Sequence, residues 1–195
     1  MKTNSNKFTF YWLEDKLYTS KFINDETLKP HPINIIMFNT VPELMERLIL
    51  DKKAELLSND IGLILDLQID SYQELLLPKS WSGYSLDKKI ITQDESYDVG
   101  LTFYEAFILG LLPNMTDNEK ANSKPFWNPP PPVIFLTVLD QYHKKYDKRI
   151  EKIKEFCIKA RGNNNPTESY VEYVNKFEVT PEKINRILKS FNIIK

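Results

Sequence analysis

Short apolar runs alternate along this chain with segments in which apolar residues recur every three or four positions. The runs predict five strands, at Phe8–Leu13, Ile33–Phe38, Ile61–Asp66, Val133–Leu136 and Tyr170–Asn175. The run Ile61–Asp66 is apolar without polar alternation until its final carboxylate. That pattern is typical of a strand buried on both faces, as in a parallel sheet.

The segments between the runs predict helices. They extend from about Leu17 to Lys29, from Val41 to Ile49, from Leu101 to Leu112, from Leu139 to Ala160, and from Pro181 to about Asn192. Thr40 and Glu43 form a capping-box pattern at the start of the second helix. The resulting order, strand-helix-strand-helix-strand, predicts an α/β fold with a doubly wound, parallel, right-handed sheet.

The pattern weakens over about 68–97 and again over about 114–128, where polar and loop-forming residues dominate. A length of 195 residues is nevertheless compatible with one large domain. We therefore expect a single domain over 1–195 that contains these two additional segments.

Composition narrows the functional classes. The 26 basic and 27 acidic residues nearly cancel, so no overall field attracts nucleic acid or a membrane. The single cysteine, Cys157, excludes an internal disulfide and fits a reducing compartment. No apolar signal core follows Met1, and no apolar run approaches the roughly 20 residues that span a bilayer. A soluble cytoplasmic protein is the expectation.

One predicted helix has an uneven charge. Lys144, Lys145, Lys148 and Arg149 begin a basic series on the helix that continues to Arg161, on the side away from its apolar stripe. The ordinary interpretation is a solvated helix face, and the alternative is a patch for an anionic partner.

Chemically useful side chains follow four of the five predicted strands. Glu14 and Asp15 follow the first, Asp66 ends the third, Thr137 follows the fourth and Lys176 follows the fifth. A single such Asp more commonly caps the next turn. In a parallel sheet, however, all these ends meet at one edge, where open α/β sheets bind their ligands.

The combination predicts phosphoryl chemistry. Three carboxylates repel one another unless a hard divalent cation neutralises them, and Mg²⁺ prefers carboxylate, water and phosphate oxygens. Thr137 could donate its hydroxyl to a phosphoryl oxygen, and Lys176 could offset the arriving negative charge. Asp66 would then be the nucleophile that forms an acyl phosphate.

The same residues, with Tyr173 three positions before Lys176, resemble the receiver domain of response regulators from about Phe8 to Phe191. The resemblance implies a flavodoxin-like strand order 2-1-3-4-5 with helices on both faces. The chain departs from that family by an extended fourth helix and by inserted segments at about 68–97 and 114–128.

The resemblance further implies roles for the site residues. Asp66 would accept a phosphoryl group from the phosphohistidine of a sensor kinase or phosphotransfer protein. Asp15 and Asp66 would bind Mg²⁺ directly, Glu14 through a water molecule, and Gln68 through its backbone carbonyl.

Thr137 and Tyr173 resemble the switch pair, whose hydroxyl and ring move when the phosphoryl group arrives. The fourth helix, fifth strand and fifth helix would form the output surface for a protein partner or a second copy. Because the chain ends shortly after the last predicted helix, we expect a stand-alone receiver-like protein without an effector domain.

Three positions depart from the receiver pattern. Asp70 replaces the usual proline after the phosphoacceptor, Val138 replaces the usual small residue after the threonine, and Phe177 replaces the proline after the lysine. These departures bear on the rate of phosphorylation and on the geometry of the Lys176 loop.

Two other functions fit the same residues. One is a receiver-like scaffold that binds a partner without phosphorylation, which Val138 and the additional segments favour. The other is a Mg²⁺-dependent phosphohydrolase that turns over an Asp66 phosphoenzyme, for which Asp70 is the candidate general acid.

Overall fold

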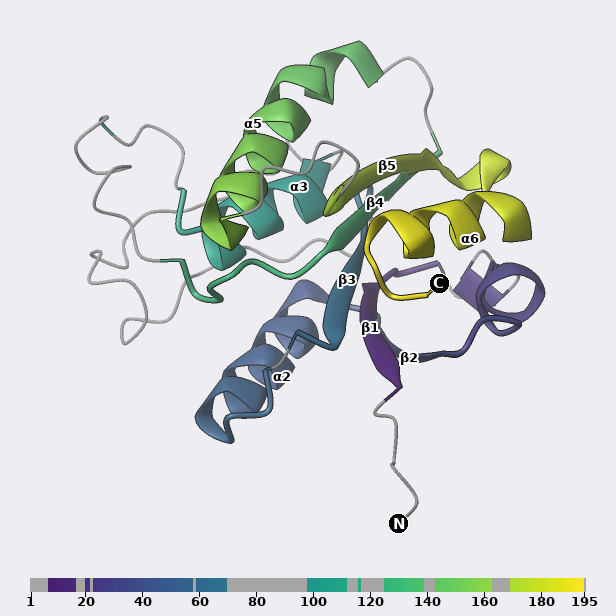
Figure 1. Cartoon of the computed structure of the whole chain (residues 1–195), viewed down its shortest axis with the longest axis horizontal. Helices are drawn as coiled ribbons and strands as arrows, with labels where there is room; N and C mark the ends of the chain where they lie inside the picture. Colours follow the sequence, from purple (N-terminus) through teal and green to yellow (C-terminus); the bar gives the residue numbers. More distant parts are fainter. Residues whose placement is uncertain are drawn as a thin grey trace.

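Five parallel strands form one sheet in the computed structural model (Figure 1), which describes residues 7–16, 20–21, 23–57, 59–69, 98–111, 116, 125–138, 143–162 and 169–194. The strands are β1 (Phe8–Leu13), β2 (Ile33–Phe38), β3 (Ile61–Asp66), β4 (Val133–Thr137) and β5 (Val171–Asn175). All six residues of β3 are buried. The sequence prediction of a strand covered on both faces is therefore confirmed.

The strand order is β2-β1-β3-β4-β5, and every neighbouring pair is parallel. The predicted doubly wound, flavodoxin-like arrangement is confirmed. The chain leaves β1 toward one side of the sheet to make β2, and then returns to the other side to make β3. The order thus reverses between β1 and β3, and such a switch point is where open α/β sheets form ligand sites.

Helical segments connect the strands or follow the last strand, β5. They are η1 (Ile23–Leu28), α2 (Val41–Lys53), α3 (Val99–Phe103) with its continuation η3 (Tyr104–Ile108), α5 (His143–Arg161), η5 (Lys176–Glu178) and α6 (Pro181–Ser190). The predicted capping box opens α2: the Glu43 backbone N–H donates to Thr40 Oγ1, and the Thr40 backbone N–H donates to Glu43 Oε2.

The helices cover both faces of the sheet (Figure 1). Alternate strand residues point to opposite faces, as the pleat requires. Tyr11 and Phe135 join the core beneath α2, α3 and α5, whereas Trp12 and Ile134 join the core beneath η1 and α6. Both cores contain aromatic side chains with no more than a few per cent exposure, so the sheet is held rigidly between two apolar layers.

Some helix limits differ from the sequence prediction. The third helix begins at Val99 and ends at Ile108, just before Gly110, which adopts a positive φ of 71°. A glycine in this conformation commonly follows a helix end, whereas the apolar pattern predicts a helix that continues to Leu112. Residues 17–19 and 22, most of 68–97 and most of 114–128 lie outside the described residues. The single-domain assignment therefore stays a prediction.

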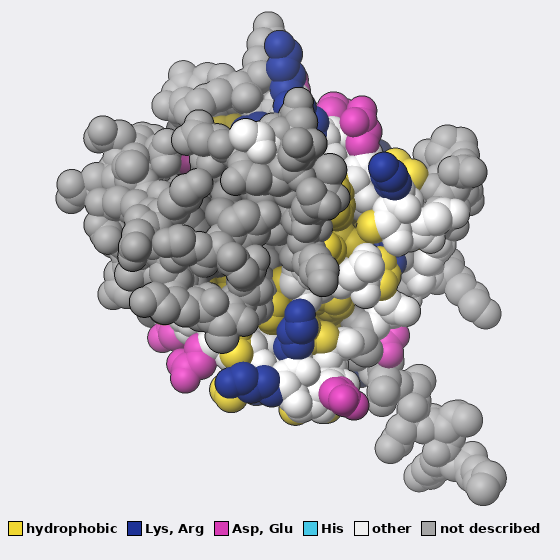
Figure 2. Space-filling model, turned by 90° about the vertical axis from the view of Figure 1, so that its left-hand side faces the viewer, with side chains coloured by type: hydrophobic (Ala, Val, Ile, Leu, Met, Phe, Trp, Pro, Cys, Tyr) yellow, Lys and Arg dark blue, Asp and Glu magenta, His cyan; other side chains and the backbone are white. Residues whose placement is uncertain are grey.

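The long helix α5 corrects one prediction about charge. Arg149 does not lie on a solvated face: its guanidinium pairs with Asp98 and Glu105 beside α3. Lys148, Lys152 and Lys159 of the basic series are exposed, whereas Arg161 donates to the Pro130 carbonyl and lies over the Tyr170 ring. On the face shown in Figure 2, acidic and basic side chains of the described residues are interspersed rather than gathered by sign.

Within the described part of the chain, no helix combines the length and the apolar character needed to cross a membrane.

Candidate metal and phosphoryl site

The sheet register brings the predicted residues of β1, β3 and β5 to one edge. Leu13 is aligned with Leu65, so the next residue on each strand, Glu14 and Asp66, are neighbours. The site residue Lys176 immediately follows Asn175, at the same edge.

Lys176 connects two of the carboxylates. Its Nζ lies 2.5 Å from Glu14 Oε2 and 2.6 Å from Asp66 Oδ2. The three side chains have 2% exposure or less. The ammonium group therefore offsets part of the negative charge of two buried carboxylates that would otherwise repel each other away from water.

Backbone groups hold the remaining carboxylate oxygens. Asp66 Oδ1 accepts the backbone N–H of Gln68 at 3.1 Å, and Glu14 Oε1 accepts the backbone N–H of Lys16 at 3.2 Å. Gln68 therefore contacts the site through its N–H, while its predicted role as a carbonyl ligand stays a prediction.

The pKa of the Asp66 carboxyl is raised to about 7, chiefly because burial disfavours its ionised form. Lys176 opposes this rise, and the negative charge of Glu14 adds to it. A carboxyl group with a pKa near neutrality is typical of functional sites, although structural ion networks perturb pKa values as well.

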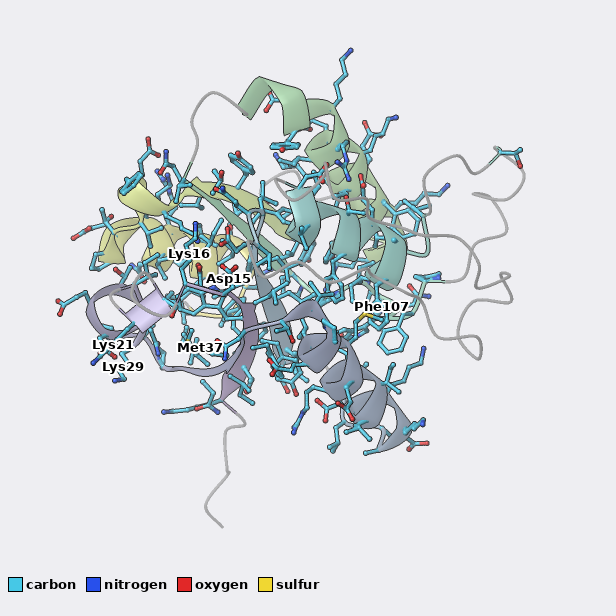
Figure 3. The ribbon with its side chains drawn as sticks, turned by 180° about the vertical axis from the view of Figure 1, so that it is seen from behind. Asp15, Lys16, Lys21, Lys29, Met37 and Phe107 are labelled. Carbon is cyan, nitrogen blue, oxygen red and sulfur yellow. The ribbon has the colours of Figure 1, made fainter. Side chains whose placement is uncertain are left out.

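Asp15 completes a candidate cation site. One carboxylate oxygen from each of Glu14, Asp15 and Asp66 lies within 4.8 Å of the others. Asp15, labelled in Figure 3, lies two residues beyond the end of β1 and is half-buried. The donors are hard oxygens, and three carboxyl groups share this edge with a single ammonium group, that of Lys176. Both properties fit a divalent cation such as Mg²⁺.

Thr137 lies at the same edge. It ends β4, is 3% exposed, and comes directly after Leu136, which is aligned with Asp66. Tyr173 lies on β5, where it is aligned with Phe135 of β4, and it packs against the core beneath α2, α3 and α5. The two residues of the predicted switch pair therefore lie on β4 and β5, the two strands beyond β3. Their switching role stays a prediction.

Two of the three residues that depart from the receiver pattern, Val138 and Phe177, are described by the structure. Val138 is half-buried next to Thr137. Phe177 is 84% exposed, and its backbone N–H donates to Asn175 Oδ1 at 2.9 Å. Asp70 lies outside the described residues, so the general acid of a phosphohydrolase has no described position.

Sequence reasoning missed Gly100. A Cβ built at this position would lie 2.4 Å from the backbone carbonyl oxygen of Asp66. Gly100 comes just before the predicted start of the third helix at Leu101, so the apolar pattern gave no signal for this close approach.

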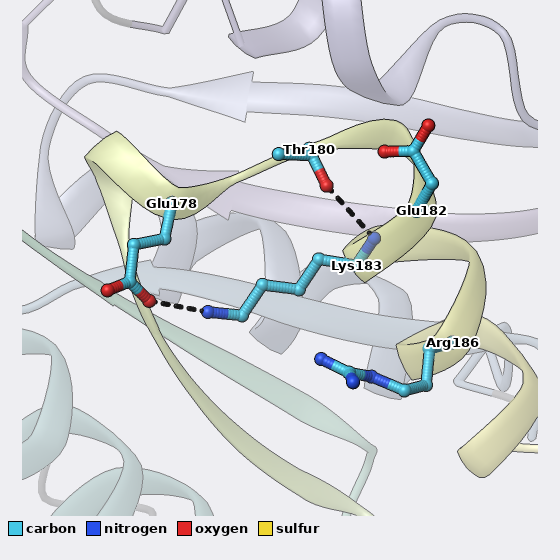
Figure 4. A pocket seen from close by; sticks show the side chains of 5 residues that line it. All are labelled: Glu178, Thr180, Glu182, Lys183 and Arg186. Atoms are coloured by element: carbon cyan, nitrogen blue, oxygen red, sulfur yellow. Dashed lines mark hydrogen bonds and ion pairs between the residues drawn. The ribbon is translucent and has the colours of Figure 1, made fainter.

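A surface pocket at the start of α6 is separate from this site. Its lining residues, shown in Figure 4, are Glu178, Thr180, Glu182, Lys183 and Arg186. Lys183 pairs with Glu178 at 2.8 Å and donates its backbone N–H to Thr180 Oγ1 at 3.2 Å. These contacts are those of an ordinary helix start and its flanking ion pair.

The fold and the edge residues together define a doubly wound α/β protein with a buried acidic cluster at its switch point. Comparisons with protein-family models, curated proteins and solved structures found no match to the chain. The resemblance to receiver domains therefore depends on the identity and strand order of the site residues.

Proposed function

We propose that this protein is a receiver-like phosphoacceptor that takes a phosphoryl group on Asp66 in the presence of Mg²⁺. The observation that carries the proposal is the pairing of Lys176 with both Asp66 and Glu14 at the switch-point edge, beside Asp15. A nucleophilic carboxylate, a fixed ammonium and a cation site are the groups that transfer to an aspartate requires.

In the proposed reaction, an Asp66 oxygen attacks the phosphorus of a phosphohistidine. The P–N bond breaks as the P–O bond forms, and the imidazole leaves with the electron pair. Mg²⁺ held by Glu14, Asp15 and Asp66 would neutralise charge on the transferring group. Because Asp66 Oδ2 is engaged by Lys176, the ammonium moves from the carboxylate to the incoming phosphoryl oxygens.

The phosphoryl oxygens would also accept the Thr137 hydroxyl, and Tyr173 would reorient with it. The surface of α5, β5 and α6 would then carry the signal to a protein partner or a second copy. Phe177 is 84% exposed beside Lys176. A partner that docked at this edge would bury its apolar ring, which would favour binding.

A first experiment tests the cation site. Mg²⁺ should bind the wild-type chain, and Asp15→Asn should weaken binding by about tenfold or more, equivalent to about 1.4 kcal/mol. The substitution keeps the shape of the side chain but removes the charge that attracts the ion. Calorimetric titration measures the affinity, ideally with beryllofluoride added as a mimic of the phosphoryl group.

Asp51→Asn is the matched control. Asp51 is also buried, but it accepts hydrogen bonds from Tyr11 and Arg47 away from the candidate site. Its replacement should leave Mg²⁺ affinity unchanged. Wild-type affinity after loss of both Asp15 and Asp66 would show that the ion binds elsewhere.

A second experiment tests access to Asp66. Val138→Ala should accelerate labelling by a small phosphodonor severalfold. Val138 is half-buried next to Thr137, and in the proposed receiver-like site its branched side chain would narrow the approach to the nucleophile. In-line attack requires a clear path, and a misplacement of about 1 Å can cost about a hundredfold in rate. Initial rates of labelling by intact mass measure the effect.

Val179→Ala provides the same truncation at another half-buried valine, which packs beneath α6. It should leave the labelling rate unchanged. Equal rates for the wild type and Val138→Ala would contradict this account of the site entrance.

A receiver-like scaffold that works without phosphorylation is the second candidate. The observation that favours it is that Asp66 is only 1% exposed, with both carboxylate oxygens already hydrogen-bonded within the protein. In that case Lys176 would serve stability alone. No phosphodonor would label the chain, although the Lys176 network would remain important for folding.

A further inference from the structure

Helix α3 approaches the end of β3 more closely than a side chain would allow. A Cβ on Gly100 would lie 2.4 Å from the Asp66 carbonyl oxygen, 3.0 Å from its carbonyl carbon and 3.0 Å from Leu65 Cβ. Two of these three atoms are backbone, so they cannot move aside by changing a rotamer. Glycine is required for this contact unless the helix or the strand end shifts.

Backbone hydrogen bonds hold the same strand end from two sides. The Val99 N–H donates to the Leu67 carbonyl at 2.9 Å, and the Leu67 N–H donates to the Leu136 carbonyl at 2.9 Å. The backbone that carries the Asp66 carboxylate is therefore enclosed between α3 and β4.

Arg149 of α5 holds the opposite side of α3. Its guanidinium contacts Asp98 Oδ2 at 2.5 Å, Thr102 Oγ1 at 3.0 Å and Glu105 Oε2 at 2.5 Å. These three acceptors are spaced four and three residues apart and share one helix face. Gly100 lies two residues after Asp98, on the face turned toward the strand.

The network is better suited to fixing a position than to adding stability. The Arg149 side chain is 31% exposed and the Asp98 side chain is 12% exposed, so both lose much of their hydration. Replacing such ion networks by apolar groups is often neutral or stabilising. Three acceptors around one planar guanidinium group fix the orientation of α3.

We propose that α3 is a brace that positions the Asp66 carboxylate, with Gly100 and Arg149 as its positioning residues. The brace connects α5 to the strand end through Arg149, α3 and the Gly100 contact. It rests on the proposed function, because positioning matters only if Asp66 binds a cation or a phosphoryl group. Groups that support metal ligands typically change metal affinity by about 10–100-fold when they are replaced.

The experiment compares Gly100→Ala and Arg149→Met with Gly62→Ala in the full chain. Gly62 is the matched control, since its Cβ would lie 2.5 Å from a Phe10 ring carbon in the same strand pair, away from Asp66. The first readout is the amide resonance of Gln68, whose N–H donates to Asp66 Oδ1. The second is Mg²⁺ affinity by calorimetric titration.

Gly100→Ala and Arg149→Met should both shift the Gln68 amide and weaken Mg²⁺ binding by about 10–100-fold. Gly62→Ala should lower stability while leaving both readouts close to those of the wild type. If Gly100→Ala does not fold, Arg149→Met alone decides the result.

An unchanged amide resonance of Gln68 in the folded Gly100→Ala or Arg149→Met variant would overturn the proposal that α3 positions Asp66. An equal change in Gly62→Ala would overturn it too, because it would indicate general loosening. If the wild-type chain binds no Mg²⁺, the proposed function fails, whereas the Gln68 amide still decides whether α3 positions Asp66.

Discussion

Asp66→Asn is expected to abolish the mass gain of one phosphoryl group that the wild-type chain acquires from a small phosphodonor and Mg²⁺. The asparagine amide occupies the same space, but it has no ionised oxygen to attack phosphorus. Intact mass spectrometry over a time course measures the labelling. The expected change is from stoichiometric labelling to none, because nothing else in the cluster has the contacts of Asp66 with both Lys176 and Gln68.

Asp51→Asn again separates this chemistry from general effects of removing a buried carboxylate. It should be labelled as fast as the wild type. Equal labelling of the Asp66→Asn variant would place the acceptor elsewhere. Labelling of neither the wild type nor any variant, from small donors or kinases, would favour the scaffold function.

Lys176→Met is expected to lower the free energy of unfolding by about 3–5 kcal/mol above neutral pH. Methionine keeps most of the side-chain volume, but it leaves the carboxylates of Glu14 and Asp66 buried without their counter-charge. Urea unfolding measures the loss. Added Mg²⁺ should recover part of it if the cation binds the same carboxylates.

The decrease in the free energy of unfolding caused by Lys176→Met should be larger at higher pH. The folded-state pKa of Asp66, about 7, lies above its ordinary value of 3.8, so the folded chain retains a proton that the unfolded chain releases. Stability associated with Asp66 therefore falls as pH rises between these two values. Without Lys176, which lowers this pKa, protonation extends to higher pH. The destabilisation should thus be smaller at about pH 5 than at about pH 8.

Lys183→Met is the control for removal of a lysine from an ion pair. Lys183 pairs with Glu178, whose side chain is 61% exposed. Exposed pairs contribute about 0–1 kcal/mol, so this substitution should have little effect at either pH. Wild-type stability of Lys176→Met at about pH 8 would contradict the importance of the buried network.

Local sequence patterns were sufficient for the architecture. Apolar runs predicted all five strands to within about a residue, and their alternation with helices predicted the parallel doubly wound sheet, which is confirmed. The capping box at Thr40 and the Thr180–Pro181 start of α6 were likewise readable, because caps depend on residues only a few positions apart.

The candidate site was readable in part. Parallel strands bring their carboxyl ends to one edge, so the sequence predicted that Glu14, Asp66 and Lys176 would lie near one another. It did not show that Lys176 would contact both carboxylates, which depends on the register of strands whose residues are 110 positions apart. The raised pKa of Asp66 has the same origin, since burial is a property of the packed sheet.

Two features were decided by tertiary structure alone. The charge pattern placed Arg149 on a solvated face, yet three acceptors at the start of α3, in α3 and in η3 turn it inward. Gly100 comes just before the predicted start of the third helix, yet the structure places it inside α3, where it meets the Asp66 carbonyl across 34 positions of sequence numbering. Helical and strand periodicity report which side of an element is apolar, because they follow from the local backbone repeat. Which element faces that side, and how closely, follows only from the packing of the whole chain.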